Sequence, residues 1–381
     1  MKKQIFLSML IFISVFLHTN TYSQTNILFT SYLIRDDNTY KNRSAQNEWI
    51  NNTSFLIGHK LGGESFQLQG YYNADFLLFN NNTDLNNNSH KFGLNGTWPG
   101  DDLSVIVSAY FKKENFKELL NYYNVQKLNL GLNLLHTPDL ANSLTAGIEV
   151  NRESYLEFSE LDNISYKISG MYQKFFQSKL SVTAQANVGL KNYINQTVIN
   201  YFGSVGGLGR MLRYQEDPIQ STIFSISTLI GKSISPSMGI SLGLGGQWFL
   251  GDPIQSYSNG IYYYTESDLF DDPFSYQDKF VSLQLTNQFD VDFQGKIGVK
   301  FQTKDYLGTP ALDNQGNLTN NTREDTRREY FLMVTKKFET SWTFPSSVSL
   351  FFNFMFRENP SNDPYYDFDD HVFLLGFAVG M

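Results

Sequence analysis

Residues 180–190 read LSVTAQANVGL, an uninterrupted alternation of apolar and polar side chains. One face carries Leu180, Val182, Ala184, Ala186, Val188 and Leu190, and the other carries Ser181, Thr183, Gln185, Asn187 and Gly189. Successive side chains of a β-strand point to opposite sides of the sheet, so this period predicts a strand with one apolar and one wet face.

The same alternation recurs along the chain, for example in residues 128–134, 144–150 and 281–286. It predicts sixteen strands, near residues 27–35, 48–59, 64–78, 90–98, 102–112, 122–135, 143–151, 162–175, 180–193, 219–231, 238–250, 276–289, 293–303, 327–338, 347–357 and 371–381. The segments 194–218 and 251–275 are long enough to hide a further hairpin, so fourteen to eighteen strands remain open.

The connections between these strands separate a membrane barrel from a soluble sandwich, which would show the same alternation. Short links such as 61–63, 98–101 and 178–179 alternate with long polar segments, which span residues 80–89, 194–218, 251–275, 304–326 and 358–370. Short periplasmic turns and long extracellular loops are typical of outer-membrane barrels, whose strand number in bacteria is even. We therefore expect an all-β, antiparallel, up-and-down transmembrane barrel.

The amino-acid composition excludes several other classes of protein and of binding site. The 381 residues contain no cysteine, which rules out disulfides, cysteine zinc sites and lipid attachment to an N-terminal cysteine. A mean hydropathy of -0.30 argues against a bundle of membrane helices. The formal charge of -8 removes the usual electrostatic basis for binding nucleic acid.

The N-terminal segment predicts export. Lys2 and Lys3 precede an apolar run over 5–17, and Thr21-Tyr22-Ser23 provides a cleavage site with small residues. The run is short for a membrane span, so we expect a cleavable signal peptide over 1–23 and a single barrel domain over 24–381, located in the outer membrane.

The tryptophans and the last strand fit such a barrel. Trp98 and Trp342 fall at the end with short turns, and Trp49 and Trp248 at the end with long loops. Indole rings prefer the headgroup level, so the four predict an aromatic girdle at each membrane interface. The C-terminal segment 371–381 alternates with outward phenylalanines, as a closing strand recognised by barrel-assembly machinery would, although it ends in Met381 rather than an aromatic residue.

Over its whole mature length the chain resembles Gram-negative outer-membrane β-barrels of the porin-like kind. A narrower resemblance concerns the segments 323–325, 357–362 and 366–369, which read RED, RENPSN and YDFD. They resemble the C-terminal end of the barrels of surface lipoprotein assembly modifiers and related tetratricopeptide-linked exporters. That resemblance implies an export or display role with a periplasmic partner.

The alternation also predicts which side chains line the lumen. The inward set is Gln67, Gln69, Asn73, Asp75, Lys112, Glu149, Lys167, Gln185, Asn187, Lys296, Lys300 and Arg357. It is rich in amides and mixed in charge, which suits water and neutral or weakly charged solutes. Sixteen strands enclose a barrel wide enough for an aqueous channel unless loops fill it.

Two kinds of loop carry further hypotheses. The segment 194–218, with Arg210 and Arg213, either folds inward and narrows the pore or extends two strands above the membrane as a hairpin. Acidic loop residues could hold divalent cations, alone or bridged to lipopolysaccharide phosphates, or could form a solvated rim; they are Asp271, Asp272, Asp367, Asp369 and Asp370.

Catalytic patterns are weak. Ser89 and His90 are neighbours, but adjacent residues of a strand point to opposite faces and cannot pair. No metal-binding histidine spacing and no cofactor motif is present in the sequence. The favoured interpretation is a non-enzymatic, porin-like passive channel for small polar solutes, in contact with outer-membrane lipid and lipopolysaccharide. The alternatives are a component for export or surface display of a protein or polysaccharide and a surface-binding barrel with a closed lumen.

Overall fold

The computed structural model describes residues 24–39, 46–157, 159–199, 216–251, 257–258, 261–262, 273–341 and 346–380. The proposed signal peptide lies outside these residues. No helix within the described ranges is long and apolar enough to cross a bilayer.

The described chain is almost entirely β-structure. The wall strands are β1 (Gln24–Asp36), β2 (Glu48–Gly62), β3 (Gln67–Phe79), β4 (Asn87–Trp98), β5 (Leu103–Phe116), β6 (Val125–Asp139), β7 (Asn142–Tyr155), β8 (Asn163–Phe175), β9 (Leu180–Ile199), β10 (Glu216–Ser233), β11 (Met238–Phe249), β14 (Gln277–Asp290), β15 (Phe293–Leu312), β16 (Leu318–Glu339), β17 (Ser347–Asn359) and β18 (Phe368–Gly380). Each corresponds to one of the sixteen strands predicted from the alternation.

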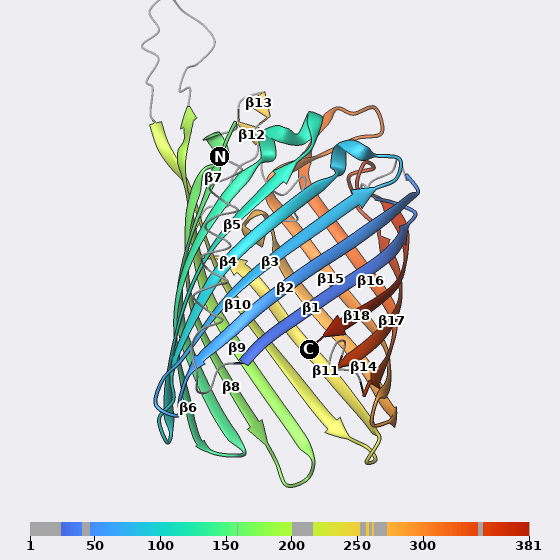
Figure 1. The fold of residues 1–381 in the computed structure, drawn as a ribbon. Coiled ribbons are helices and arrows are strands. Elements are labelled where there is room, and N and C mark those ends of the chain that lie inside the picture. Colours follow the sequence, from blue (N-terminus) through green and yellow to red (C-terminus); the bar gives the residue numbers. More distant parts are fainter. Residues whose placement is uncertain are drawn as a thin grey trace, which may run out of the picture.

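These strands form one closed antiparallel barrel in which every strand pairs with its neighbours in the sequence (Figure 1). Closure joins β1 to β18, with partners running from Leu28 and Gly380 to Asp36 and Val372. β11 pairs directly with β14, because β12 (Tyr257–Ser258) and β13 (Ile261–Tyr262) form a separate two-stranded sheet. The prediction of a sixteen-strand up-and-down barrel is confirmed.

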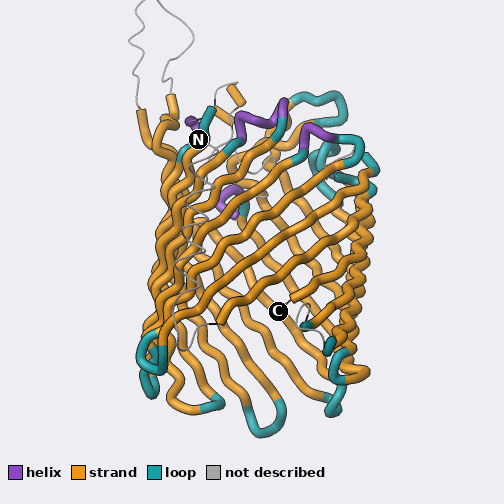
Figure 2. Tube along the Cα trace, viewed as in Figure 1, coloured by secondary structure: helices purple, strands orange, loops and turns teal. Residues whose placement is uncertain are grey.

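The two ends of the barrel differ (Figure 2). We call one the turn end, where short connections such as 63–66, 140–141 and 291–292 join the strands. At the other, the loop end, the connections include the 3₁₀ helices η1 (Thr83–Leu85), η2 (Glu118–Tyr123), η3 (Ser159–Leu161) and η4 (Pro273–Ser275). This asymmetry is the one expected of periplasmic turns and extracellular loops.

Three strands continue beyond the predicted ends. β9 extends to Ile199, and β15 and β16 extend to Leu312 and Leu318, so most of the expected long loop 304–326 is a hairpin. The sequence missed these extensions because both faces of a strand are wet outside the membrane, and the apolar alternation stops there while the pairing continues.

The outer face of the wall is apolar. On β6, Leu130 is 53% exposed, whereas its neighbour Asn129 is only 4% exposed. Exposed leucines, isoleucines and phenylalanines recur in this outward register on most strands, which a water-soluble sandwich could not tolerate. The wall is therefore built to face lipid.

Candidate functional site

Strand register decides which side chains share the inner face. Directly paired residues of neighbouring strands lie on the same side of a sheet. Lys127, Glu153 and Lys191 line one cavity inside the barrel, and they alternate with the exposed outward residues on their strands. Following the pairing from these positions around the ring assigns the inner face of each strand.

The structure places the whole predicted lumen set on this inner face. The set is Gln67, Gln69, Asn73, Asp75, Lys112, Glu149, Lys167, Gln185, Asn187, Lys296, Lys300 and Arg357. Their contact with a passing solute stays a prediction.

Several charges on the inner face lie in ion pairs. Lys127 Nζ lies 2.7 Å from Glu153 Oε1, and Lys112 Nζ lies 2.9 Å from Glu114 Oε2. On the far side of the ring, Arg357 Nε donates to Glu329 Oε1 at 2.9 Å. These pairs leave a polar surface without a ring of one sign.

Amide and hydroxyl groups complete this surface. Asn73 Nδ2 donates to Asp75 Oδ2 at 2.7 Å, and Ser89 Oγ donates to the same oxygen at 3.1 Å. Asn187 Nδ2 donates to Ser225 Oγ at 3.1 Å. The side chains hold one another in place, so the wall presents fixed dipoles to the lumen.

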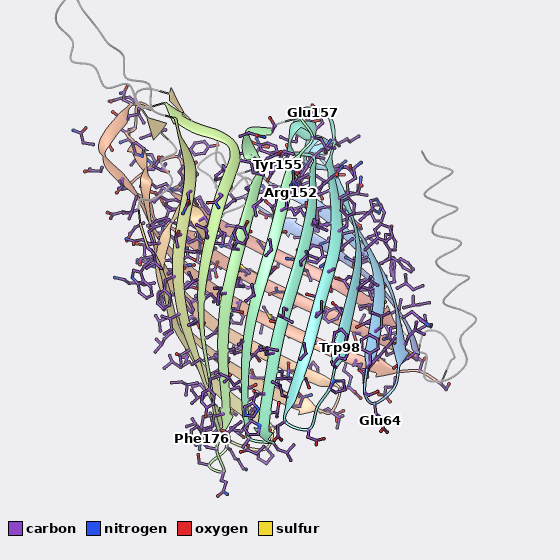
Figure 3. All side chains as sticks on the ribbon, turned by 90° about the vertical axis from the view of Figure 1, so that its left-hand side faces the viewer. Glu64, Trp98, Arg152, Tyr155, Glu157 and Phe176 are labelled. Atoms are coloured by element: carbon purple, nitrogen blue, oxygen red, sulfur yellow. The ribbon has the colours of Figure 1, made fainter. Side chains whose placement is uncertain are left out.

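A cavity of about 280 Å³ opens on the inner face at the loop end. Its lining comes from β5 to β9 and from η4, and comprises Glu114, Phe116, Val125, Lys127, Asn151, Glu153, Tyr155, Asn163, Ser165, Lys191, Pro273 and Phe274. Figure 3 shows Arg152, Tyr155 and Glu157 at this end, and Trp98, Glu64 and Phe176 at the opposite end.

Residues 273–276 lie against the inner wall beside this cavity. Ser221 Oγ donates to the carbonyl of Phe274 at 3.4 Å, and Gln247 Nε2 donates to the carbonyl of Tyr276 at 2.8 Å. The Phe274 ring lies beneath Lys191 Nζ, 5.8 Å from its centroid. Alternation within a strand could not predict this inward contact, because it depends on two polar side chains from other strands.

The described flanks of the loop proposed to constrict the pore are paired strands. Glu216 pairs with Ile199 and Asp217 with Val198, so the described flanks form an extended hairpin. Arg210 and Arg213 lie outside the described residues. Their inward folding stays a prediction.

The acidic loop residues proposed to bind cations do not lie together. Asp271 and Asp272 lie outside the described chain, and Asp369 pairs with Glu358 on the outward register. Asp370 instead faces inward, and its carboxylate approaches those of Asp36 and Asp37 within 4.8 Å. The sequence missed this group because barrel closure brings the two ends of the chain together.

Side chains of the protein already contact this acidic group. Asp370 Oδ2 lies 3.3 Å from Arg357 Nη1, and Asp37 Oδ2 lies 2.8 Å from His371 Nδ1. Arg357 thus provides a positive charge beside Asp370, and the cation-binding role of Asp367, Asp369 and Asp370 stays a prediction.

Ser89 and His90 occupy opposite faces of β4. Ser89 hydrogen-bonds to Asp75 in the lumen, whereas Nδ1 of His90 lies 2.8 Å from the hydroxyl of Tyr72 on the outer face. The two side chains do not form a nucleophile and base pair.

The tryptophans lie near the strand ends. Trp49 and Trp248 stand at the loop end of β2 and β11, and Trp98 ends β4 at the turn end. Trp342 is outside the described residues. A role of these rings in a headgroup girdle stays a prediction.

The inner face also contains apolar side chains that the alternation did not predict. Phe331, Met333, Met355 and Leu374 occupy inward positions on β16 to β18. The residues predicted to face outward on β17 and β18 do so, but part of the inner face of these strands is apolar as well, so the contrast between their two faces is weak.

A closed sixteen-strand wall, an apolar outer face and a polar inner face together define an integral outer-membrane β-barrel. No protein-family model and no curated protein matches the sequence.

Solved structures of outer-membrane barrels show a similar arrangement. OccAB1 of Acinetobacter baumannii is 10% identical, with coverage of 94% of this chain and 97% of that chain and a TM-score of 0.49. The outer membrane protein OprD of Pseudomonas aeruginosa is 11% identical, with 94% of each chain covered and a TM-score of 0.49. OpdK of the same organism is 8% identical, with 94% and 99% covered and a TM-score of 0.46.

Proposed function

We propose that this barrel is a passive channel for small polar solutes across the outer membrane. The observation that carries the proposal is the inner face, where amides, hydroxyls and locally paired charges follow β4 to β11. An inner face of this kind is wetted, and a barrel of sixteen strands has room for an aqueous path.

The proposal includes no catalytic step. Ser89 and His90 face opposite sides of the wall, and the acidic group around Asp370 is held by Arg357 and His371. Neither arrangement places a reactive atom beside a base.

The test is single-channel conductance of the purified, refolded chain in a planar bilayer. A folded barrel is recognised beforehand by its altered gel mobility before and after heating. A steady open conductance is expected. A silent bilayer from folded protein would contradict the channel and direct the search to a periplasmic partner or a surface ligand.

Deleting residues 203–209 tests the constriction hypothesis in the same apparatus. If that loop narrows the pore, the deletion raises the conductance. An unchanged conductance would show that it extends above the barrel instead.

A further inference from the structure

One row of inward side chains near the seam of the barrel is almost wholly apolar. Direct pairing links six neighbouring strands, from β16 through the closing pair to β3, in the order Met333, Asn353, Leu374, Ile34, Ile50 and Phe79. Five of the six are hydrophobic, although all of them belong to the inner face.

The rows on either side are apolar only in part. Towards the loop end the row runs through Phe331, Met355 and Val372 and then ends in the acidic Asp36 and Glu48. Towards the turn end, Phe351 and Tyr32 flank Gly376 with their rings 5.9 Å apart, and the row ends in Thr335 and Asn52. We call the apolar residues of these three rows the apolar wall: Phe331, Met333, Phe351, Met355, Val372, Leu374, Tyr32, Ile34, Ile50 and Phe79.

Most of the apolar wall is open to the lumen, although Ile50 is buried. Phe331, Met333, Met355, Val372 and Leu374 are all half-buried. A soluble protein would cover such a surface, and a solute passing along it can bury apolar area there.

The opposite side of the ring is polar. Eight positions around from β1 and β18 lie β9 and β8, whose inward residues include Lys167, Gln185 and Asn187. Glu149 pairs directly with Lys167 across β7 and β8. The lumen therefore has an apolar wall facing a wall of amides and balanced charges.

A polar atom interrupts the apolar wall. The side-chain oxygen of Asn353 is buried and has no hydrogen-bond partner among the described residues. Asn353 lies between Met333 and Leu374 in the central row.

We propose, on the basis of the channel function above, that the lumen favours amphipathic solutes over fully polar solutes of the same size. The class is a small molecule with a branched hydrocarbon or aromatic side and polar groups of balanced charge. Its apolar side contacts the apolar wall while its polar groups keep hydrogen bonds on the other wall.

The test compares leucine with asparagine in a liposome swelling assay. The two are zwitterions with the same number of non-hydrogen atoms that differ in an apolar or amide side chain, so net charge is matched, and the larger volume of leucine would slow it rather than favour it. Swelling of protein-free liposomes is subtracted for each solute. Leucine is expected to enter faster than asparagine through the unaltered barrel.

Leu374→Ala and Leu375→Ala form a matched pair on β18. Leu374 faces the apolar wall, whereas Leu375 is 63% exposed on the outer face. Removing the inward leucine is expected to lower the leucine to asparagine ratio about threefold, since it takes away apolar contact area. The outward variant should leave the ratio unchanged.

The outcomes separate the two proposals. Swelling with both solutes but an equal ratio in the unaltered protein and in the Leu374 variant would overturn the amphipathic preference and leave the channel standing. No swelling with either solute would overturn the channel itself. Heat-dependent gel mobility shows that each variant is folded before it is measured.

Discussion

At the residue scale, glycines make room for aromatic rings on neighbouring strands. A Cβ built at Gly93 would lie 2.2 Å from Cζ of Tyr71, and one at Gly376 would lie 2.2 Å from Cδ1 of Tyr32. The ring of each tyrosine covers the strand where the glycine leaves backbone exposed. Such cross-strand pairs pin the register of a sheet.

Gly93→Ala should therefore destabilise the barrel. The methyl group must displace Tyr71, which also lies beneath Lys91, at a cost of about 1–3 kcal/mol. Denaturant unfolding in lipid vesicles measures the change.

Gly170→Ala is the matched control, because a Cβ there meets nothing within 4 Å. Equal stability of the two variants would show that the ring is free to move aside.

At the element scale, the hairpin of β15 and β16 is tied to the loop after β17. The guanidinium carbon of Arg323 lies 4.0 Å from the ring centroid of Tyr306 and 3.3 Å from that of Tyr366. Arg323 Nε also donates to Asp325 Oδ1 at 3.0 Å, and Ser361 Oγ donates to the same oxygen at 2.8 Å. The loop is thus held by stacking and by a shared carboxylate.

Arg323→Lys should loosen this loop without opening the barrel. Lysine lacks the planar fork that binds a carboxylate and stacks between rings, so a local loss of about 1–3 kcal/mol is expected. Faster hydrogen exchange in residues 360–367 is the readout.

Arg328→Lys serves as the control on the same strand, since its pair with Glu358 is long, at 3.6 Å, and partly exposed. If the amide hydrogens of residues 360–367 exchange equally fast in both variants, the stacking of Arg323 does not hold the loop.

The turn between β15 and β16 depends on an ionised carboxylate. The backbone N–H of Asn317 donates to Asp313 Oδ1 at 2.8 Å, as does that of Gln315. These donors, with the Asn317 side chain, hold the pKa of Asp313 below its usual value of 3.8.

A lowered pKa means that the carboxylate stabilises the turn above pH 3.8 and that this contribution is lost as pH falls through the lower folded value. Amide exchange of Asn317 should accelerate below pH 4 relative to the strand amides, after correction for intrinsic rates. Asp313→Ala should remove that pH dependence. A pH dependence that survives the substitution would assign it to another group.

At the scale of the whole molecule, the balance of charge in the lumen governs ion selectivity. Both signs of charge line the inner face, and Lys112, Lys127 and Arg357 lie in ion pairs there, so the open channel should show weak preference between small cations and anions. The reversal potential in a salt gradient is expected to lie near zero.

Glu149→Gln should shift that potential towards anion preference. The change removes the carboxylate directly opposite Lys167, whose side chain is exposed in the lumen. Glu339→Gln is the control, because Glu339 lies 75% exposed at the turn end beside Lys337. An equal shift of the reversal potential in both variants would show that charges outside the lumen set the ion selectivity.

The sequence by itself determined where the strands lie and most of their faces, and it predicted sixteen strands while leaving fourteen to eighteen open. Alternation of apolar and polar residues is a local property. In a run such as 180–190, where one side is apolar, it indicates which side chains face lipid. On β17 and β18 the predicted outward residues, such as Phe352 and Leu375, do face outward, but the inward Phe351 and Leu374 beside them are apolar as well.

Only the tertiary structure decided which distant residues meet. Closure brings Asp36 beside Asp370, and lateral pairing places Arg357 next to Glu329. It also sets the apolar wall opposite β8 and β9 and the segment 273–276 against the inner wall. The physical reason is that register and ring closure join residues across the whole chain, whereas alternation records only the two sides of each strand.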